Sequence, residues 1–183
     1  MRGSEFTSGM PSLRTPNSAL RTLIMYSVTK LLSFCYGRRL LNYDGKCRYL
    51  HGHNGRAEIE LAAERLDARG MVRDFTEIKR TIQGWIDAEL DHKMILNAKD
   101  PVIPLLRTLK EPLYLIDENP TAEALARMIF EQAKRMGFPV RSVRLWETDS
   151  SFAVYQPAAE PARARGRRAA GRRDPARSIA TSA

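Results

Sequence analysis

The sequence is poor in the features on which disulfide-stabilised and membrane-spanning proteins depend. Its two cysteines are too few for a disulfide framework, so we expect both thiols to be reduced and Cys35 to be a small buried apolar residue. No stretch approaches the roughly 18 to 20 consecutive apolar residues of a transmembrane helix, and the first residues lack the pattern of a secretory signal. We therefore expect a cytoplasmic protein with no membrane partner. With 43% hydrophobic residues, the 183-residue chain can still build one ordinary globular core.

The net charge of +9 would suit a nucleic-acid binder, but the positive charge is concentrated at the two ends. Residues 157–183 hold seven arginines against two acidic residues, and residues 1–24 hold three arginines against one. The region between them is close to neutral, and end segments rich in Ala, Pro, Gly and Arg cannot bury a core. We expect a solvated, disordered arginine-rich tail, with nucleic-acid binding as the less favoured alternative. Residues 1–24 are interpreted as a cloning-vector remnant and a flexible segment.

Residues 25–156 show the periodic patterns of strands and helices. Strands are expected over residues 25–35, over 56–63, and on either side of an Asp149-Ser150 turn signal. Between the second and third strands, Asp74 has capping-box spacing to Glu77 and predicts the start of a helix. The apolar residues on one face of that helix are Phe75, Ile78, Ile82, Trp85 and Leu90.

A second helix is expected over residues 121–136, ending before Gly137. It is separated from the first helix by a connection of about thirty residues, long enough to be functional or partly structured. The order β-β-α-α-β-β predicts an α+β fold in which a four-stranded antiparallel sheet carries two helices on one face. The uncovered sheet face and unpaired sheet edges favour a homo-oligomer.

All three histidines lie in two short motifs, Cys47-Arg-Tyr-Leu-His51-Gly-His53-Asn54 and Asp91-His92. In an extended chain His51 and His53 project from the same face, so two imidazoles can meet one metal ion. Cys47 can reach the same cavity as a nucleophile or base, and Asp91 with His92 can form an acid–base pair. Each motif alone has a plain structural interpretation: two histidines do not close a tetrahedral shell, and a histidine at a helix end is favoured by the helix dipole. Their joint occurrence favours a catalytic site.

Further motifs surround these two along the chain: Gly37-Arg-Arg-Leu-Leu, Asp74-Phe75, Leu90-Asp-His92, Leu96-Asn97, Pro120-Thr-x-Glu123 and Glu147-Thr148. In this order they resemble the 6-pyruvoyl-tetrahydropterin synthase and 6-carboxytetrahydropterin synthase superfamily, over residues 34–155. The spacing of Cys47 from His51 is similar to that of the bacterial 6-carboxytetrahydropterin synthases, the branch that feeds queuosine biosynthesis. The resemblance implies a T-fold, and barrels, usually hexamers, with active sites at subunit boundaries.

The resemblance also implies an activity and residue roles. The expected reaction converts 7,8-dihydroneopterin triphosphate into 6-carboxy-5,6,7,8-tetrahydropterin, acetaldehyde and triphosphate. Cys47 would abstract a side-chain proton, and Asp91 with His92 would relay protons. Glu147 would accept hydrogen bonds from the pterin, with Thr121 and Thr148 nearby. Zinc on His51 and His53 would act as a Lewis acid on the substrate's hydroxyl groups.

One position departs from the family pattern. Where the resemblance places a third histidine ligand for zinc, this chain has Arg38. A guanidinium has no lone pair to donate and stays protonated, so we expect zinc binding to be weak or absent. Two alternatives stay open beside the carboxytetrahydropterin reaction: elimination of triphosphate to a pyruvoyl product, and a pterin-binding protein that Arg38 has disabled.

Overall fold

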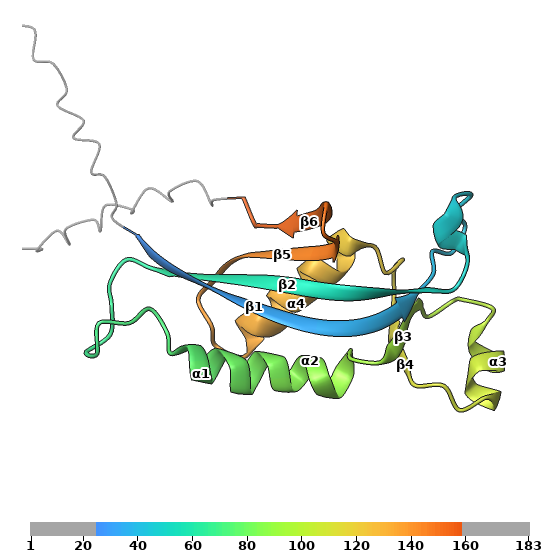
Figure 1. The fold of residues 1–183 in the computed structure, drawn as a ribbon, viewed down its shortest axis with the longest axis horizontal. Coiled ribbons are helices and arrows are strands. Elements are labelled where there is room, and N and C mark those ends of the chain that lie inside the picture. Colours follow the sequence, from blue (N-terminus) through green and yellow to red (C-terminus); the bar gives the residue numbers. More distant parts are fainter. Residues whose placement is uncertain (1–24, 159–183) are drawn as a thin grey trace, which may run out of the picture.

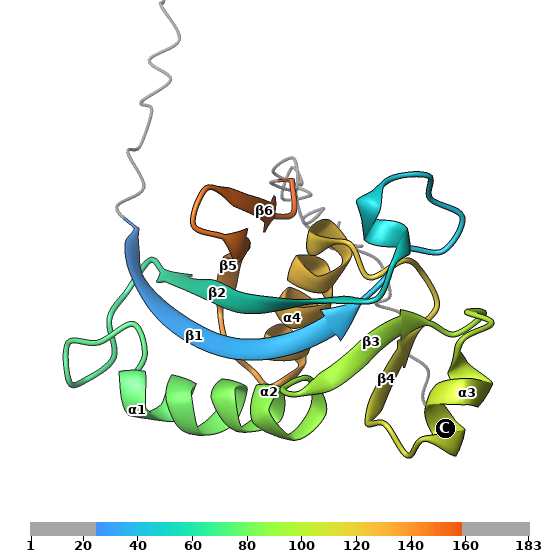
Figure 2. The same ribbon diagram turned by 45° about the vertical axis from the view of Figure 1, so that its right-hand side comes forward.

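The computed structural model describes residues 25–158, which form a curved sheet with helices packed against it (Figures 1 and 2). The predicted vector remnant and N-terminal segment, residues 1–24, lie outside the described residues. So does the predicted arginine-rich tail from residue 159 onward. In the described part of the chain, no helix is both long and apolar enough to cross a membrane.

The sheet holds six strands in the spatial order β4-β3-β1-β2-β5-β6. Its antiparallel part consists of β1 (Tyr26–Arg38), β2 (His51–Ala63), β5 (Val140–Thr148) and β6 (Ser151–Tyr155). These are the four strands that the sequence predicts, and they confirm the expected α+β class. Both β1 and β2 are 13 residues long, more than predicted, and their pairing places Arg38 opposite His51.

The prediction of only four strands is wrong, because two short strands lie within the long connection between the helices. Strand β3 (Lys93–Asn97) runs parallel to the end of β1, and β4 (Leu113–Ile116) runs parallel to β3. The central residues of β3 are apolar without alternation, as is typical of parallel strands that are covered on both faces. Periodicity in apolar segments as short as β3 and β4 cannot distinguish a strand from a buried turn of helix.

The helical elements are η1 (Lys46–Arg48), α1 (Phe75–Ile78), η2 (Lys79–Gln83), α2 (Gly84–Glu89), α3 (Ile103–Thr108) and α4 (Ala122–Arg135). Together α1, the π-helical η2 and α2 make up the first predicted helix. Asp74 caps it as predicted, because its carboxylate accepts a hydrogen bond from the backbone N–H of Thr76 at 2.7 Å. The second predicted helix is α4, and Gly137 follows it in the left-handed conformation, at φ 86°.

The main core lies between one face of the sheet and the two long helices. Ile78, Ile82 and Leu90 of the first helix are fully buried there, as predicted. Phe75 is an exception: its side chain is 49% exposed, because it stands in the first turn, and the ammonium of Lys30 lies 5.9 Å from its ring centroid. The prediction that Phe75 belongs to the buried face is therefore wrong.

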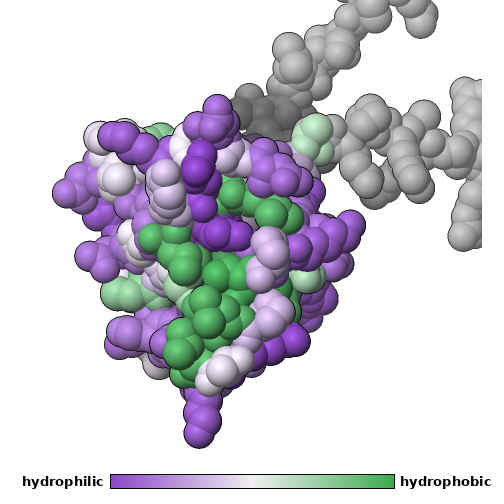
Figure 3. Space-filling view, turned by 90° about the vertical axis from the view of Figure 1, so that its right-hand side faces the viewer, coloured by the Kyte–Doolittle hydropathy of each residue, from purple (hydrophilic) through white to green (hydrophobic). Residues whose placement is uncertain are grey.

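A smaller apolar cluster occupies the end of the molecule that carries β3, β4 and α3. Leu96, Ile103 and Leu106 are buried in it. Figure 3 views this end and shows a continuous hydrophobic area on the surface. Leu105 and Leu109, from α3 and the residue after it, are among the exposed apolar side chains of the described residues. This arrangement leaves apolar surface next to an unpaired sheet edge.

Candidate active site

The end of β1 brings Arg38 into the molecule. Strand alternation points Tyr36 and Arg38 toward the helix-covered face, and the Arg38 side chain is nearly buried. All three of its nitrogens donate hydrogen bonds: Nε to His53 Nε2 at 3.2 Å, Nη1 to the Pro120 carbonyl at 2.7 Å and Nη2 to Glu147 Oε2 at 2.7 Å. One guanidinium thus joins β1 to β2, to β5 and to the loop before α4.

Glu147 has both carboxylate oxygens engaged within the protein. Oε2 accepts from Arg38, and Oε1 accepts from the Tyr36 hydroxyl at 2.9 Å. Burial, followed by the charge of Glu147, raises the pKa of Tyr36 far above its ordinary value, so the phenol stays protonated and donates. The carboxylate is therefore fixed in position before any ligand arrives.

The two predicted metal-binding histidines lie together. Their ring centroids are 5.0 Å apart, with the rings nearly perpendicular. His51 Nδ1 donates to the Tyr49 carbonyl at 2.7 Å, which leaves a lone pair on Nε2. This Nε2 is buried and has no hydrogen-bond partner in the part of the chain that the structure describes. Burial lowers the pKa of His53, so its neutral imidazole accepts the Arg38 Nε–H.

Zinc does not fit the groups that this site offers. Among residues 25–158, no three or more His, Cys, Asp or Glu side chains are grouped so that they could hold a metal ion. The third position is taken by Arg38, whose Nε–H already occupies the lone pair of His53. A tetrahedral centre needs at least three protein donors, and here there are two imidazoles, one of them engaged.

The Asp91-His92 pair follows α2, as predicted from the sequence. Asp91 Oδ2 accepts from His92 Nδ1 at 2.7 Å, and Asp91 Oδ1 accepts from the backbone N–H of Cys35 at 2.7 Å. The hydrogen bond from Cys35 N–H, followed by that from His92, holds the pKa of Asp91 below its usual range. His92 adopts the left-handed conformation, at φ 56°, and its side chain is 79% exposed. The carboxylate thus fixes the orientation of the His92 imidazole through its Nδ1.

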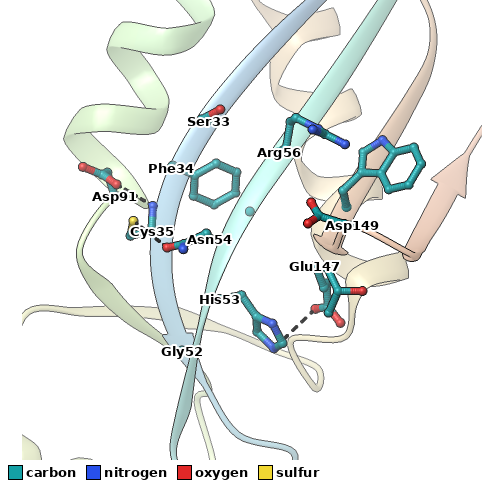
Figure 4. Close-up of a pocket in the computed structure, with 13 residues that line it drawn as sticks. Ser33, Phe34, Cys35, Gly52, His53, Asn54, Arg56, Asp91, Glu147 and Asp149 are labelled. Atoms are coloured by element: carbon teal, nitrogen blue, oxygen red, sulfur yellow. Dashed lines mark hydrogen bonds and ion pairs between the residues drawn. The ribbon is translucent and has the colours of Figure 1, made fainter.

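This pair lies beside Cys35. The expectation that Cys35 is buried is wrong: the residue is exposed, because alternation turns it to the face opposite Tyr36 and Arg38. Its thiol donates to Asn54 Oδ1 at 3.2 Å. Figure 4 shows Cys35 near Asp91 and Asn54, and His53 near Glu147.

Two cavities open at these groups. The larger, of about 760 Å³, is lined among others by Cys35, His53, Asp91 and Glu147. A second, of about 360 Å³, is lined by Cys35, His53 and His92, among others. Both volumes are in the range of small-molecule sites.

Cys47, the predicted proton acceptor, lies in η1 and is half-buried. Its carbonyl accepts from the backbone N–H of Leu40 at 2.8 Å, which anchors the turn to the end of β1. Among the described residues, the side chain of Cys47 makes no hydrogen bond to Asp91 or His92. The structure therefore does not bring the predicted thiol and the predicted acid–base pair together within this chain.

Each of the two predicted threonines lines a cavity together with Glu147. Thr121 caps α4 through a hydrogen bond from the Ala124 N–H at 3.2 Å and lines a cavity of about 310 Å³ with Arg38 and Glu147. Thr148 lines the 760 Å³ cavity and accepts from the Ser150 N–H at 3.3 Å. Sequence analysis missed Tyr36, although its place two residues before Arg38 on a strand put it on the same face.

Comparisons with known proteins find relatives over the described part of the chain. A family model described as 6-pyruvoyl tetrahydropterin synthase matches residues 27–158. A 6-carboxy-5,6,7,8-tetrahydropterin synthase of Rickettsia bellii is 36% identical over 138 residues, covering 70% of this chain and 98% of the relative. The protein of that name from Haemophilus influenzae is 31% identical over 140 residues, covering 72% and 99%.

Solved structures show the same fold. An uncharacterized protein of Wolinella succinogenes superimposes with a TM-score of 0.65 at 26% identity, covering 74% of this chain and 99% of that one. The 6-pyruvoyl tetrahydropterin synthase of Caenorhabditis elegans gives a TM-score of 0.56 at 21% identity, with 74% and 98% covered. The sheet curvature and the two long helices are therefore those of the T-fold, as predicted. From its sequence match and its architecture together, the chain belongs to the 6-pyruvoyl tetrahydropterin synthase family.

Proposed function

We propose that this protein converts 7,8-dihydroneopterin triphosphate and water into 6-carboxy-5,6,7,8-tetrahydropterin, acetaldehyde and triphosphate, as a step of queuosine biosynthesis in the cytoplasm. The observation that carries the proposal is the fixed carboxylate of Glu147 in a cavity that is also lined by Asp91. Relatives that are 31 to 36% identical and bear the name of this activity support the choice of reaction.

Pterin recognition rests on Glu147. A carboxylate presents two acceptors in one plane, which matches the amino and ring N–H groups along one edge of a pterin. Glu147 lines one cavity with Thr148 and another with Thr121. Because Arg38 and Tyr36 hold the carboxylate, a bound pterin has to share its oxygens or displace one of these donors.

Proton transfer rests on Cys47, Asp91 and His92. A thiolate at Cys47 abstracts a proton from the substrate's side chain, and the imidazole of His92, held by Asp91, relays protons. Since the pair lies beside Cys35 in its own subunit, we place Cys47 opposite the His92 of an adjoining subunit. A homo-oligomer, a hexamer by resemblance to the family, supplies that contact. The unpaired edges at β4 and β6 and the apolar surface near α3 support assembly.

Product analysis tests the proposal. Purified protein is incubated with 7,8-dihydroneopterin triphosphate, and the pterin product is identified by mass. The proposal predicts 6-carboxytetrahydropterin with an equal amount of acetaldehyde. A product that keeps the carbon side chain, with triphosphate released, would instead establish the pyruvoyl reaction.

A second candidate is a pterin-binding protein without turnover, and the contacts of Arg38 favour it. Arg38 engages both Glu147 and His53, two groups that the lyase reaction would use. This candidate predicts that pterin fluorescence is quenched on binding while the substrate remains intact over hours. Glu147→Gln serves as the control, because it removes the proposed recognition group from a site that both candidates share.

A further inference from the structure

The Arg38 guanidinium fills the position at which a third metal ligand would stand. Its three donors meet three acceptors on three different segments, at 2.7 to 3.2 Å. The side chain is nearly buried, so these contacts are not exchanged for water. A positive charge held in this way is a permanent part of the site.

We infer that Arg38 takes the place of the metal ion in this chain, so that the site binds no metal and Arg38 positions Glu147 and His53 instead. The inference rests on the contacts of Arg38 and on membership of the family. It does not depend on which product the proposed reaction gives.

The two histidines do not offer enough free nitrogen lone pairs to bind a metal ion. An ion bound there would need Nε2 of His51 and Nε2 of His53, and the second already accepts the Arg38 Nε–H. Binding would break that hydrogen bond and place a divalent charge beside the guanidinium. The orphaned His51 Nε2 alone cannot hold the ion, because one imidazole does not make a site.

Charge balance leads to the same conclusion. Arg38 and Glu147 form a buried pair of opposite charge, with Nη2 and Oε2 2.7 Å apart. The charges of Arg38 and Glu147 therefore compensate each other within the site. A divalent ion would bring two uncompensated charges into a largely desolvated place.

Arg38 is thus a positioning residue. Its planar guanidinium fixes the carboxylate of Glu147 in one orientation. It also orients the ring of His53, which accepts the Arg38 Nε–H. Lysine would keep the positive charge but, as a compact ammonium, could not reach the same three acceptors.

The experiment measures zinc in proteins purified from zinc-supplemented cultures and dialysed against metal-free buffer. Wild type, Arg38→His and Arg39→His are compared by elemental analysis and by competition with a chromogenic chelator. Arg39 is the matched control, since it neighbours Arg38 but pairs with Asp100 instead. We expect wild type and Arg39→His to hold far less than one zinc per subunit, and Arg38→His to hold about one.

Two results would overturn the inference. The first is about one zinc per subunit in the wild type that disappears in His51→Ala, because Arg38 would then not exclude the metal. The second is a folded Arg38→His protein that still binds no zinc. The wild-type measurement does not depend on the folding of any variant. Because zinc content is read without substrate, an inactive protein would contradict the proposed function and leave this test intact.

Discussion

Nη2 of Arg38 lies 2.7 Å from Oε2 of Glu147, and the side chains are only 6% and 16% exposed. The two residues are 109 positions apart in the sequence and are joined across β1, β2 and β5. A pair that is this well buried should behave differently from the surface ion pairs of the same protein.

Replacing Glu147 by Gln should therefore destabilise the fold measurably. It leaves the Arg38 charge buried without its counter-charge, which costs about 3 to 5 kcal/mol in comparable pairs. The matched control is Glu118→Gln, which breaks the exposed pair with Arg127, at about 0 to 1 kcal/mol. Urea unfolding of both variants makes the comparison, and equal losses would contradict the role of the buried pair.

Tyr36→Phe should cost about 1 to 3 kcal/mol, because Oε1 of Glu147 loses its partner while remaining partly buried. The exposed Tyr43 provides the control, as Tyr43→Phe should change the free energy of unfolding by less than about 0.5 kcal/mol. Absorbance titration adds a second measurement. Since the pKa of Tyr36 is raised by burial and by Glu147, its phenol should stay protonated beyond about pH 10, where an unperturbed tyrosine ionises. If Tyr36→Phe removed a phenol that ionises near pH 10 in the wild type, the result would be inconsistent with the structure.

Asp91 should make the free energy of unfolding depend on pH in the acid range. Hydrogen bonds from the Cys35 N–H and from His92 lower its folded pKa below the unfolded value of about 3.9. A carboxyl group with a lowered folded pKa contributes stability that is complete above the unfolded pKa and is lost as the pH falls through the folded pKa. Asp91→Asn should therefore lower the free energy of unfolding at pH 7, with an effect that shrinks below about pH 4. Denaturation of both proteins from pH 7 to pH 3 measures this, and a constant difference across the range would argue against it.

The two thiols should differ in function. Cys47→Ser should lower kcat by about 10² to 10⁴-fold while pterin binding persists, as expected for removal of a catalytic base. Lys46→Ala, in the same turn but exposed, controls for disturbance of η1. Steady-state kinetics and pterin fluorescence separate the two effects. Full turnover by Cys47→Ser would remove Cys47 from the mechanism and direct attention to Cys35, which lies beside Asp91.

Local patterns were enough to predict much of the fold and part of the site. The two-residue spacing of His51 and His53 predicts that they share a face, and the rings do lie 5.0 Å apart. Asp74 predicts the start of the first helix because the capping hydrogen bond is formed within two residues. Such features depend on near neighbours in the chain.

Other features depend on contacts that no local pattern encodes. β3 and β4 are too short and too uniformly apolar for periodicity to reveal them. The exposure of Cys35 follows from its place on β1, whereas its residue type favours burial. The sequence alone shows that Arg38 stands where the family has a histidine. It does not show the hydrogen-bond partners of Arg38, which lie 15, 82 and 109 positions farther along the chain.

The most direct test of the account is turnover of 7,8-dihydroneopterin triphosphate by the wild-type protein in metal-free buffer, with and without added zinc. We predict formation of 6-carboxytetrahydropterin and acetaldehyde at the same rate in both conditions. Absence of product in both conditions would contradict the proposed lyase function, and product only after zinc is added would contradict the role assigned to Arg38.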